Sequence, residues 1–350
     1  MRRTLVLVAA MACCGLAANR GLAAFQTRAS TVSVVDTTSP QVRLPGTVFV
    51  SQDGAIYAIS GSSVRRLPLP AGGDWMQPRA LPDGTLVVVR RYDEYSDLYH
   101  VSAAGHILNQ LTADDQSTSN RTLQLDHWIL WPAISPDGTT VYFATDSPKP
   151  APRQGYEVDF SLWSAPLSES VAIDDSGVAG GTRWSVPDAY TGGDIEPVPL
   201  PDGNVLYSSY ANTGKGTVVS VLGLQTAPRS PMVSLTTAAQ DCGSPAVAAD
   251  GVTVAMVCTN RGQTASLEIA TLEGTTLSAP RVVVANCLCD APSWSPSGDD
   301  LLYMNASDPD GNFGLWYIAG AAGAHPGAAK RVTNASVDLD ATSAAAWISR

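Results

Sequence analysis

Acidic residues recur at one position of this 350-residue chain, a few residues before segments that have the composition of β-strands. The six aspartates that share this position are Asp74, Asp126, Asp194, Asp241, Asp290 and Asp340. Carboxylate oxygens are the ligands that calcium prefers in proteins. If the fold gathers these side chains, they would bind a cation or a basic segment of a partner, with Asp194, Asp241 and Asp290 as the candidate metal ligands. The alternative is that each Asp closes a local turn by accepting backbone amide hydrogens.

Other side chains that are typical of binding surfaces fall in the expected loops. Aromatic and Arg residues on exposed loops are common binding anchors. Besides the six aspartates, the predicted partner-binding residues are His127, Trp128, Glu196, Tyr92, Tyr95, Arg153 and Tyr156. Arg153 and Tyr156 belong to a Pro-rich insertion, 147–159, that is long enough to be a partner-specific element. The alternative for all of these positions is an ordinary solvated loop.

The sequence offers little that indicates catalysis. It has four His, and only His127 falls beside other polar residues in an expected loop before a strand. No Gly-x-Ser-x-Gly nucleophile motif is present in the sequence. Asp308-Pro-Asp310-Gly311-Asn312 lacks the Gly at the sixth position and the later Glu of an EF-hand loop and is interpreted as a hairpin turn. We therefore expect a protein without catalytic machinery and without a firmly implied cofactor, calcium being the one candidate.

A recurring phrase predicts the elements that position these residues. It consists of Pro, about four residues, and a tight turn that ends in Gly. Its five copies are 78–84, 132–138, 197–203, 245–251 and 292–298. A repeat of about 50 residues made of β-type segments is typical of a β-propeller.

Each repeat is interpreted as four antiparallel strands. In the second repeat the later strands are expected at 86–91, 97–102 and 107–112. Residues 45–69 supply three strands without the opening phrase, and 344–348 supply a lone opening strand. The prediction is an all-β, six-bladed β-propeller of four-stranded blades, whose ring is closed when the C-terminal strand completes the first blade.

The phrase Pro132-Ala-Ile-Ser-Pro-Asp137-Gly138, the Leu162-Trp163 third strand and the Leu111-Thr112 ending resemble the WD40-like (PD40) repeats of TolB-type propellers. The resemblance covers about 45–350 and does not include the N-terminal domain of TolB. It implies an envelope or secreted binding protein. Peptidases with similar repeats carry an additional hydrolase domain, for which this sequence has no room.

The N-terminal residues indicate export. Met1-Arg2-Arg3 precedes a short apolar run, which predicts a signal peptide at 1–24 and a linker at 25–44. Cleavage after Ala23 or Ala24 is one reading, and a lipoprotein processed at Cys13 is the other. We expect a periplasmic, cell-surface or secreted monomer with no transmembrane span after signal removal. A net charge of −11 argues against nucleic acid as a partner.

Four Cys follow the predicted signal: Cys242, Cys258, Cys287 and Cys289. An even number in an exported chain predicts disulfides. The hairpin around Asp250 places Cys242 opposite Cys258, which is the first choice, with Cys258–Cys289 as the rival. Cys287 and Cys289 are so close in sequence that we expect them to stay reduced or to pair otherwise.

The predicted function is binding of a protein, peptide or glycan through the face that carries the joins between repeats. The alternative is a propeller-based hydrolase or lyase whose active site converges in the central channel, because such residues leave no linear motif.

Overall fold

The structure is a computed structural model that describes residue 42 and residues 44–114, 126–149, 158–212, 217–262 and 264–349. All of them belong to the unit Val35–Arg350. The predicted signal peptide, Cys13, Arg153 and Tyr156 lie outside the described residues. So does the predicted linker, apart from residues 42 and 44.

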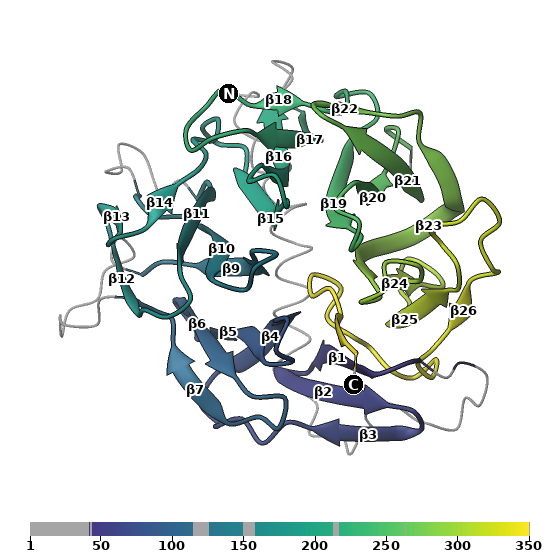
Figure 1. The fold of residues 1–350 in the computed structure, drawn as a ribbon, viewed down its shortest axis with the longest axis horizontal. Helices are drawn as coiled ribbons and strands as arrows, with labels where there is room; N and C mark the ends of the chain where they lie inside the picture. Colours follow the sequence, from purple (N-terminus) through teal and green to yellow (C-terminus); the bar gives the residue numbers. More distant parts are fainter. Residues whose placement is uncertain are drawn as a thin grey trace, which may run out of the picture. The chain divides into compact units, whose positions relative to one another are not determined.

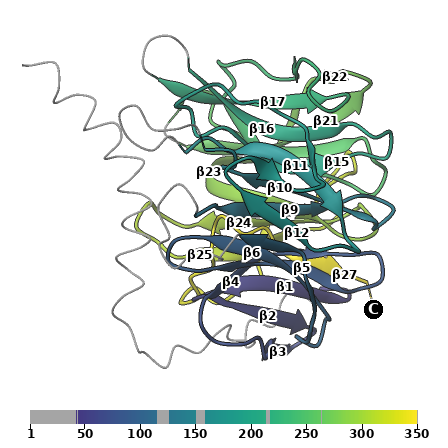
Figure 2. The same ribbon diagram turned by 90° about the vertical axis from the view of Figure 1, so that its left-hand side faces the viewer.

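All regular secondary structure in the described ranges is β-strand, which confirms the all-β class. Figure 1 shows the sheets side by side around a centre, and Figure 2 shows strands such as β16 and β17 crossing from one face of this unit to the other. No helix among these residues is long and apolar enough to cross a membrane.

Four of the sheets have four strands each. The first has the order β27-β1-β2-β3, with bounds Ala346–Ile348, Thr47–Gln52, Ala55–Ser60 and Ser63–Arg66. The second has the order β4-β5-β6-β7, with bounds Asp74–Ala80, Leu86–Arg91, Ser96–Val101 and Ile107–Gln110. The third has the order β9-β10-β11-β14, with bounds Ile129–Ile134, Thr140–Thr145, Ser161–Pro166 and Thr182–Arg183. The fourth has the order β15-β16-β17-β18, with bounds Asp194–Pro199, Val205–Asn212, Val218–Gln225 and Val233–Ser234.

The other two sheets are less regular. One is a three-stranded sheet in which β8, Thr112–Asp114, pairs in parallel with β12, Val171–Asp174, followed by β13, Gly177–Val178. The other has eight strands, because the long strand β23 pairs with β21 through its first half and with β24 through its second. Its members are β19 Cys242–Val247, β20 Thr253–Cys258, β21 Ala265–Glu273, β22 Thr276–Leu277, β23 Arg281–Trp294, β24 Leu301–Ala306, β25 Phe313–Ile318 and β26 Lys330–Arg331.

The recurring phrase forms the innermost strand of a sheet and the turn that follows it. The Gly at its end has a positive φ, 73° at Gly138 and 87° at Gly203, which side chains rarely adopt. In each turn the amide of this Gly donates to a carbonyl three residues earlier, as from Gly138 to Ser135 at 2.8 Å. The phrase is therefore a hairpin, and all its copies place their turns on the same face, here called the turn face. The opposite face, where one sheet leads to the next, is called the join face.

Apolar side chains fill the space between neighbouring sheets. Val87, Val89 and Phe143 belong to one buried cluster that joins the second sheet to the third. Phe49 and Trp75 belong to another that joins the first sheet to the second. This packing fixes the inner strands, which carry the candidate site.

Candidate functional site

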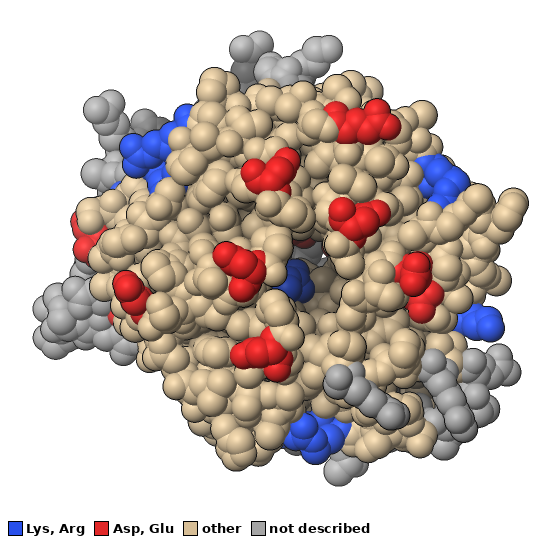
Figure 3. Space-filling view, viewed as in Figure 1, with Lys and Arg blue, Asp and Glu red and all other residues tan. Residues whose placement is uncertain are grey.

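The inner strands surround a cavity of about 390 Å³. Its wall comes from β4, β9, β15, β19, β23 and β27, and turn residues such as Pro136, Pro201 and Pro296 lie at its edge. The cavity therefore reaches the turn face. Figure 3 shows a central hollow in which a basic side chain is visible, with acidic side chains spaced around it.

Each inner strand with the recurring Pro is bulged at the same place. The residue directly before Pro has a φ near +50° in all five copies: Gln77, Trp131, Glu196, Ser244 and Ala291. Positive φ is uncommon for residues other than Gly. An extra residue in one strand, with a shift of register, is the definition of a β-bulge, and such bulges re-aim side chains. Four of the five residues line the cavity, and the fifth, Gln77, does not.

The bulges are joined to one another by hydrogen bonds. The amide of Trp131 donates to Oε1 of Gln77 at 2.6 Å, and the amide of Ser244 donates to Oε2 of Glu196 at 3.0 Å. The amide of Gln77 donates to Oγ of Ser343 at 2.9 Å. Polar side chains thus satisfy backbone groups that the bulges withdraw from the sheets.

Two carboxylates meet beside the cavity. Glu196 accepts from Oγ of Ser208 at 2.7 Å, and Oγ of Ser244 lies 3.4 Å from its other oxygen. The same Ser244 hydroxyl donates to Asp290, which also accepts from the amide of Ala291 at 2.7 Å. Ser244 therefore bridges the two acids.

Burial makes these acids hard to ionise together. Burial, and then the nearby charge of Asp290, raise the pKa of Glu196 to about 7 against the hydrogen bonds from Ser208 and Ser244. Burial likewise raises the pKa of Asp290. Two like charges cannot easily share such a site, so the pair retains a proton near neutral pH.

One cation faces the same cavity. Arg79, near the end of β4, lines it and donates from Nη1 to the carbonyls of Pro78 and Ala344 at 3.2 and 3.1 Å. Burial lowers the pKa of Arg79 to about 10, while the negative charge of Glu196 acts in the opposite direction. Arg79 therefore stays charged at neutral pH.

Exposed aspartates of the recurring turns surround the cavity mouth. These five rim aspartates are Asp83, Asp137, Asp202, Asp250 and Asp299. Hydrogen bonds from Thr85 to Asp83, and from Ser135 and Thr139 to Asp137, lower the pKa of both carboxyls. Asp83 and Asp137 are therefore ionised, and the acidic rim gives this mouth a negative potential.

Of the six aspartates predicted to act together, Asp74, Asp241 and Asp340 are held by contacts within the joins, whereas Asp290 lies beside the cavity. Asp74 pairs with Arg91 at 2.7 Å. Asp241 accepts from the amide of Ser220 at 2.8 Å, and Asp340 accepts from the amide of Thr342 at 3.0 Å. Asp194 is buried, and burial raises its pKa. These contacts are of the kind that the local-turn alternative describes.

Among the described residues, no group of three or more His, Cys, Asp or Glu side chains is arranged to hold a metal ion. The side chains present in those ranges thus do not fit the expected calcium site, and no step is derived from it.

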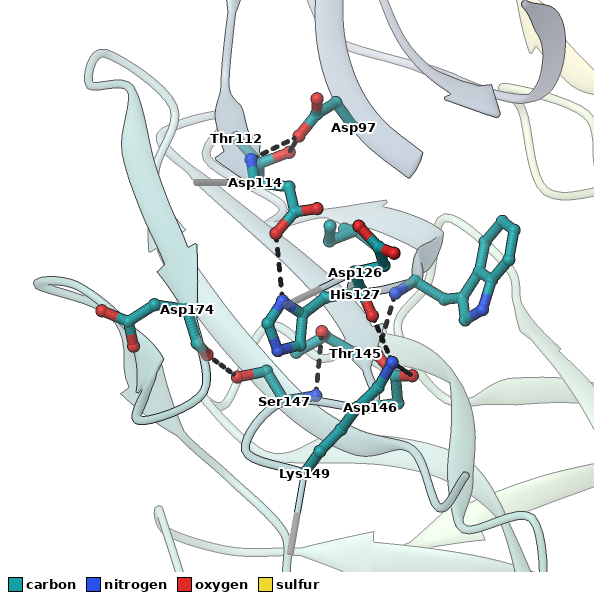
Figure 4. Close-up of polar contacts among 12 residues, drawn as sticks. Asp97, Thr112, Asp114, Asp126, His127, Thr145, Asp146, Ser147, Lys149 and Asp174 are labelled. Atoms are coloured by element: carbon teal, nitrogen blue, oxygen red, sulfur yellow. Dashed lines mark hydrogen bonds and ion pairs between the residues drawn. The ribbon is translucent and has the colours of Figure 1, made fainter. Parts of the chain in front are cut away.

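His127 and Asp126 belong to a buried polar cluster on the join face, drawn in Figure 4. Nδ1 of His127 lies 3.0 Å from Oδ1 of Asp114, and neither side chain is exposed. Nζ of Lys149 lies 3.0 Å from Oδ2 of Asp146 and also donates to the carbonyl of Asp126. The cluster ties β8, β9 and β10 together, and the His127 side chain is enclosed in it.

Trp128 is held at its backbone by the same cluster, because its amide donates to Oδ1 of Asp146 at 2.8 Å. Tyr92 and Tyr95 stack on each other with ring centroids 4.4 Å apart. Arg90 lies 5.0 Å from the centroid of Tyr92. These predicted partner-binding residues are thus partly used in contacts within their own sheet.

The Cys242–Cys258 disulfide is confirmed, and it joins directly opposed residues of β19 and β20. The rival pairing of Cys258 with Cys289 is wrong. Cys287 and Cys289 are joined to each other, whereas the sequence led us to expect reduced thiols or another pairing. Alternate residues of a strand point to the same side, which brings these two together on β23.

Arg79, Ser244 and the rim aspartates were not among the predicted site residues. The signal that could have found Ser244 is its place before the recurring Pro, which it shares with Glu196. Glu196 was predicted, but as a residue of the join face.

Comparisons with known proteins support the fold. No family model matches the chain, and no curated protein matches it. Among solved structures, TolB from Acinetobacter baumannii is similar with a TM-score of 0.59 and 15% identity over 89% of this chain and 68% of that one. A protein of Agrobacterium tumefaciens assigned as a TolB is similar with a TM-score of 0.52 and 14% identity over 82% and 88%. Oligogalacturonate lyase in complex with manganese follows, with a TM-score of 0.50 and 14% identity over 80% and 70%. The chain thus has a TolB-like propeller fold.

Proposed function

We propose that this protein is an exported, non-catalytic binding protein, and that it takes a basic segment of a protein or peptide partner at the turn face rather than at the join face. The observation that carries the proposal is the cavity, with Glu196 in its wall and exposed aspartates around its mouth. A rim of negative charges attracts a positively charged segment and raises its rate of association.

The architecture behind this proposal is a six-bladed propeller spanning 45–350, after a signal peptide at 1–24 and a linker at 25–44. Support comes from β27, which pairs with β1 and so adds a fourth strand to the first sheet. Export is supported by the two disulfides, because disulfides persist in oxidising compartments.

Anisotropy of a fluorescein-labelled, Lys-rich peptide with acetylated and amidated ends would test the proposal. Replacing Asp137, Asp202 and Asp250 with Asn should weaken binding about tenfold and reduce its salt dependence. The matched control replaces three exposed acids of join-face loops: Asp93→Asn, Glu94→Gln and Asp308→Asn. Equal losses in the two triple variants would contradict the turn face as the site.

A second candidate is an enzyme that acts on a glycan. The observation in its favour is the Glu196–Asp290 pair, because two neighbouring carboxyl groups are the usual acid and base of glycan cleavage. Release of new reducing ends from polysaccharides by the protein, abolished by Glu196→Gln, would establish this candidate. Absence of release at several pH values would leave binding as the function.

A further inference from the structure

Two opposite charges face the cavity without touching. Arg79 and Glu196 both line it, and each influences the pKa of the other. Yet these two residues form no ion pair within 4.0 Å in the described structure. Buried opposite charges attract strongly when they can approach. Here the strands hold them apart, because Arg79 is anchored on β4 by two carbonyls and Glu196 on the bulge of β15 by two serines.

Both groups keep unused hydrogen-bonding capacity. A guanidinium has five N–H donors, and the contacts of Arg79 engage only its Nη1. A carboxylate has about four acceptor sites. In Glu196, Oε2 accepts from the Ser208 hydroxyl and the Ser244 amide, whereas Oε1 has only a 3.4 Å contact with Oγ of Ser244. A ligand with an anionic group beside Arg79 and a cationic group beside Glu196 would supply hydrogen-bond partners for both side chains.

The rest of the wall combines apolar and aromatic side chains with hydroxyl groups such as those of Ser293 and Thr342. Trp131, Ile134, Val198 and Trp294 line the cavity between and beside the charged groups. A volume of about 390 Å³ lies at the lower end of the range for small-molecule sites. The four apolar residues offer a surface on which an aliphatic or aromatic side chain of a ligand can pack.

We propose that the cavity binds a small zwitterion, a free amino acid or very short peptide with both ends unblocked. Its carboxylate pairs with Arg79, its ammonium group pairs with Glu196, and its side chain packs on the apolar wall. This inference rests on the proposed binding function and names the ligand that enters the cavity itself.

Binding of the ammonium group should release a proton. Glu196 shares a proton with Asp290 near neutral pH, and an ammonium ion beside it favours the ionised form. The charged or titratable groups that face Glu196 are Arg79 on β4 and Asp290 on β23, while β9 and β19 present Trp131 and Ser244. Affinity should therefore rise from pH 5.5 to about pH 7.5 and fall above pH 8, where the α-amino group of the peptide loses its charge.

The experiment is calorimetry with the dipeptide Ala-Leu at pH 7, in two buffers of different ionisation enthalpy. N-acetyl-Ala-Leu and Ala-Leu-amide are the matched ligands that lack one charge each. We expect binding of Ala-Leu with proton release, and a loss of about tenfold or more for each blocked ligand.

Two variants test which residue binds the carboxylate of the ligand and which binds its ammonium group. Arg79→Gln should bind Ala-Leu and Ala-Leu-amide equally, because the carboxylate has lost its partner. Glu196→Gln should bind Ala-Leu and N-acetyl-Ala-Leu equally and should release no proton. Circular dichroism melting of both variants verifies that they are folded, and Asp93→Asn, on an exposed loop of the join face, is the control that should keep wild-type preferences.

The other outcomes overturn the inference in distinguishable ways. If Ala-Leu fails to bind while the Lys-rich capped peptide binds, the zwitterion site is wrong and the proposed function stands. If neither binds, both fail. If glucuronate binds in an Arg79-dependent manner and Ala-Leu does not, the cavity takes acidic sugars instead.

Discussion

The two faces of this propeller use acidic residues in opposite ways. On the join face, acidic residues stabilise the fold. Asp74 pairs with Arg91, Asp241 accepts a hydrogen bond from a backbone amide, and Asp146 is buried beside Lys149. On the turn face, the rim aspartates are exposed, and Glu196 stands in the wall of a cavity. Both disulfides lie toward the join face, where strands β19 and β20 are tied together at Cys242 and Cys258.

The position of an acidic residue within a repeat therefore does not predict its role, which depends on the residues that its side chain contacts. Residues with satisfied, buried contacts support stability, and residues whose charge faces solvent or a cavity are available to a ligand. Substitutions should therefore separate the faces: join-face changes should lower the free energy of unfolding, and turn-face changes should alter binding.

The largest effect is expected at the buried cluster. Asp146→Ala would leave Lys149 without this carboxylate and the amide of Trp128 without its acceptor. Breaking a buried ion pair costs about 3–5 kcal/mol. Urea unfolding should show this loss, with Asp93→Ala on an exposed loop as the control. If Asp146→Ala lowers the free energy of unfolding by less than about 1 kcal/mol, the acids of this cluster do not stabilise the fold more than exposed acids do.

The next effect concerns the disulfides. The Cys242–Cys258 bridge closes a separation of 16 residues, and the Cys287–Cys289 bridge a separation of 2. Because the entropy gained grows with the closed loop, the double variant Cys242→Ala/Cys258→Ala should lose about 2–4 kcal/mol. Cys287→Ala/Cys289→Ala should lose less in the same unfolding assay. The opposite order would show that cross-linking entropy does not govern these two bridges.

Glu196→Gln should stabilise the protein in alkaline solution. The pKa of Glu196 is raised to about 7 in the folded state, above its ordinary value of 4.5. A raised pKa means that stability is fully present below pH 4.5 and is lost as pH rises through 7. The glutamine variant escapes that loss, so its free energy of unfolding should exceed that of the wild type by about 3 kcal/mol at pH 8 and differ little at pH 4.5. Melting curves at the two pH values check this, and a variant that is less stable at both would refute the buried-charge account.

The smallest effect is expected for a single rim residue. Asp83→Asn keeps an acceptor for Thr85 in an exposed turn. Surface changes of this kind usually alter stability by less than about 0.5 kcal/mol. The melting temperature should be unchanged while affinity for a Lys-rich peptide falls slightly. A clear loss of stability would mean that rim aspartates, like those of the join face, are structural.

Much of the fold could be predicted because the repeat combines turn chemistry with alternating strands. The strands predicted at 86–91 and 301–306 are observed as Leu86–Arg91 and Leu301–Ala306. Outer strands are shorter than predicted: the strand expected at 232–236 is reduced to Val233–Ser234, because an edge strand pairs on one side only. The sequence pattern did not indicate the parallel pairing of β8 with β12, because the two strands belong to different repeats.

The site could be predicted only in part. Spacing indicated that acids precede inner strands, and Glu196 was included among the candidates. It could not indicate that bulges place four of the five residues before Pro in the cavity wall, because a positive φ at Trp131 or Ser244 runs against the ordinary preference before Pro. Arg79 is positioned by the carbonyls of Pro78 and Ala344, and the contact with Ala344, 265 positions away in the sequence, gives no sequence signal.

The pairing of β27 with β1 has a consequence for how the chain acquires its structure during synthesis. Trp347 donates from Nε1 to the carbonyl of Pro45 at 2.6 Å, across 302 positions of sequence. The ribosome synthesises β1 long before β27. One edge of β1 therefore stays unpaired until nearly all the other strands have been synthesised. Contacts of such long sequence separation form slowly, and open strand edges invite association with other chains. The first sheet is therefore completed last, and the period of greatest vulnerability to aggregation lasts for almost the whole of translation.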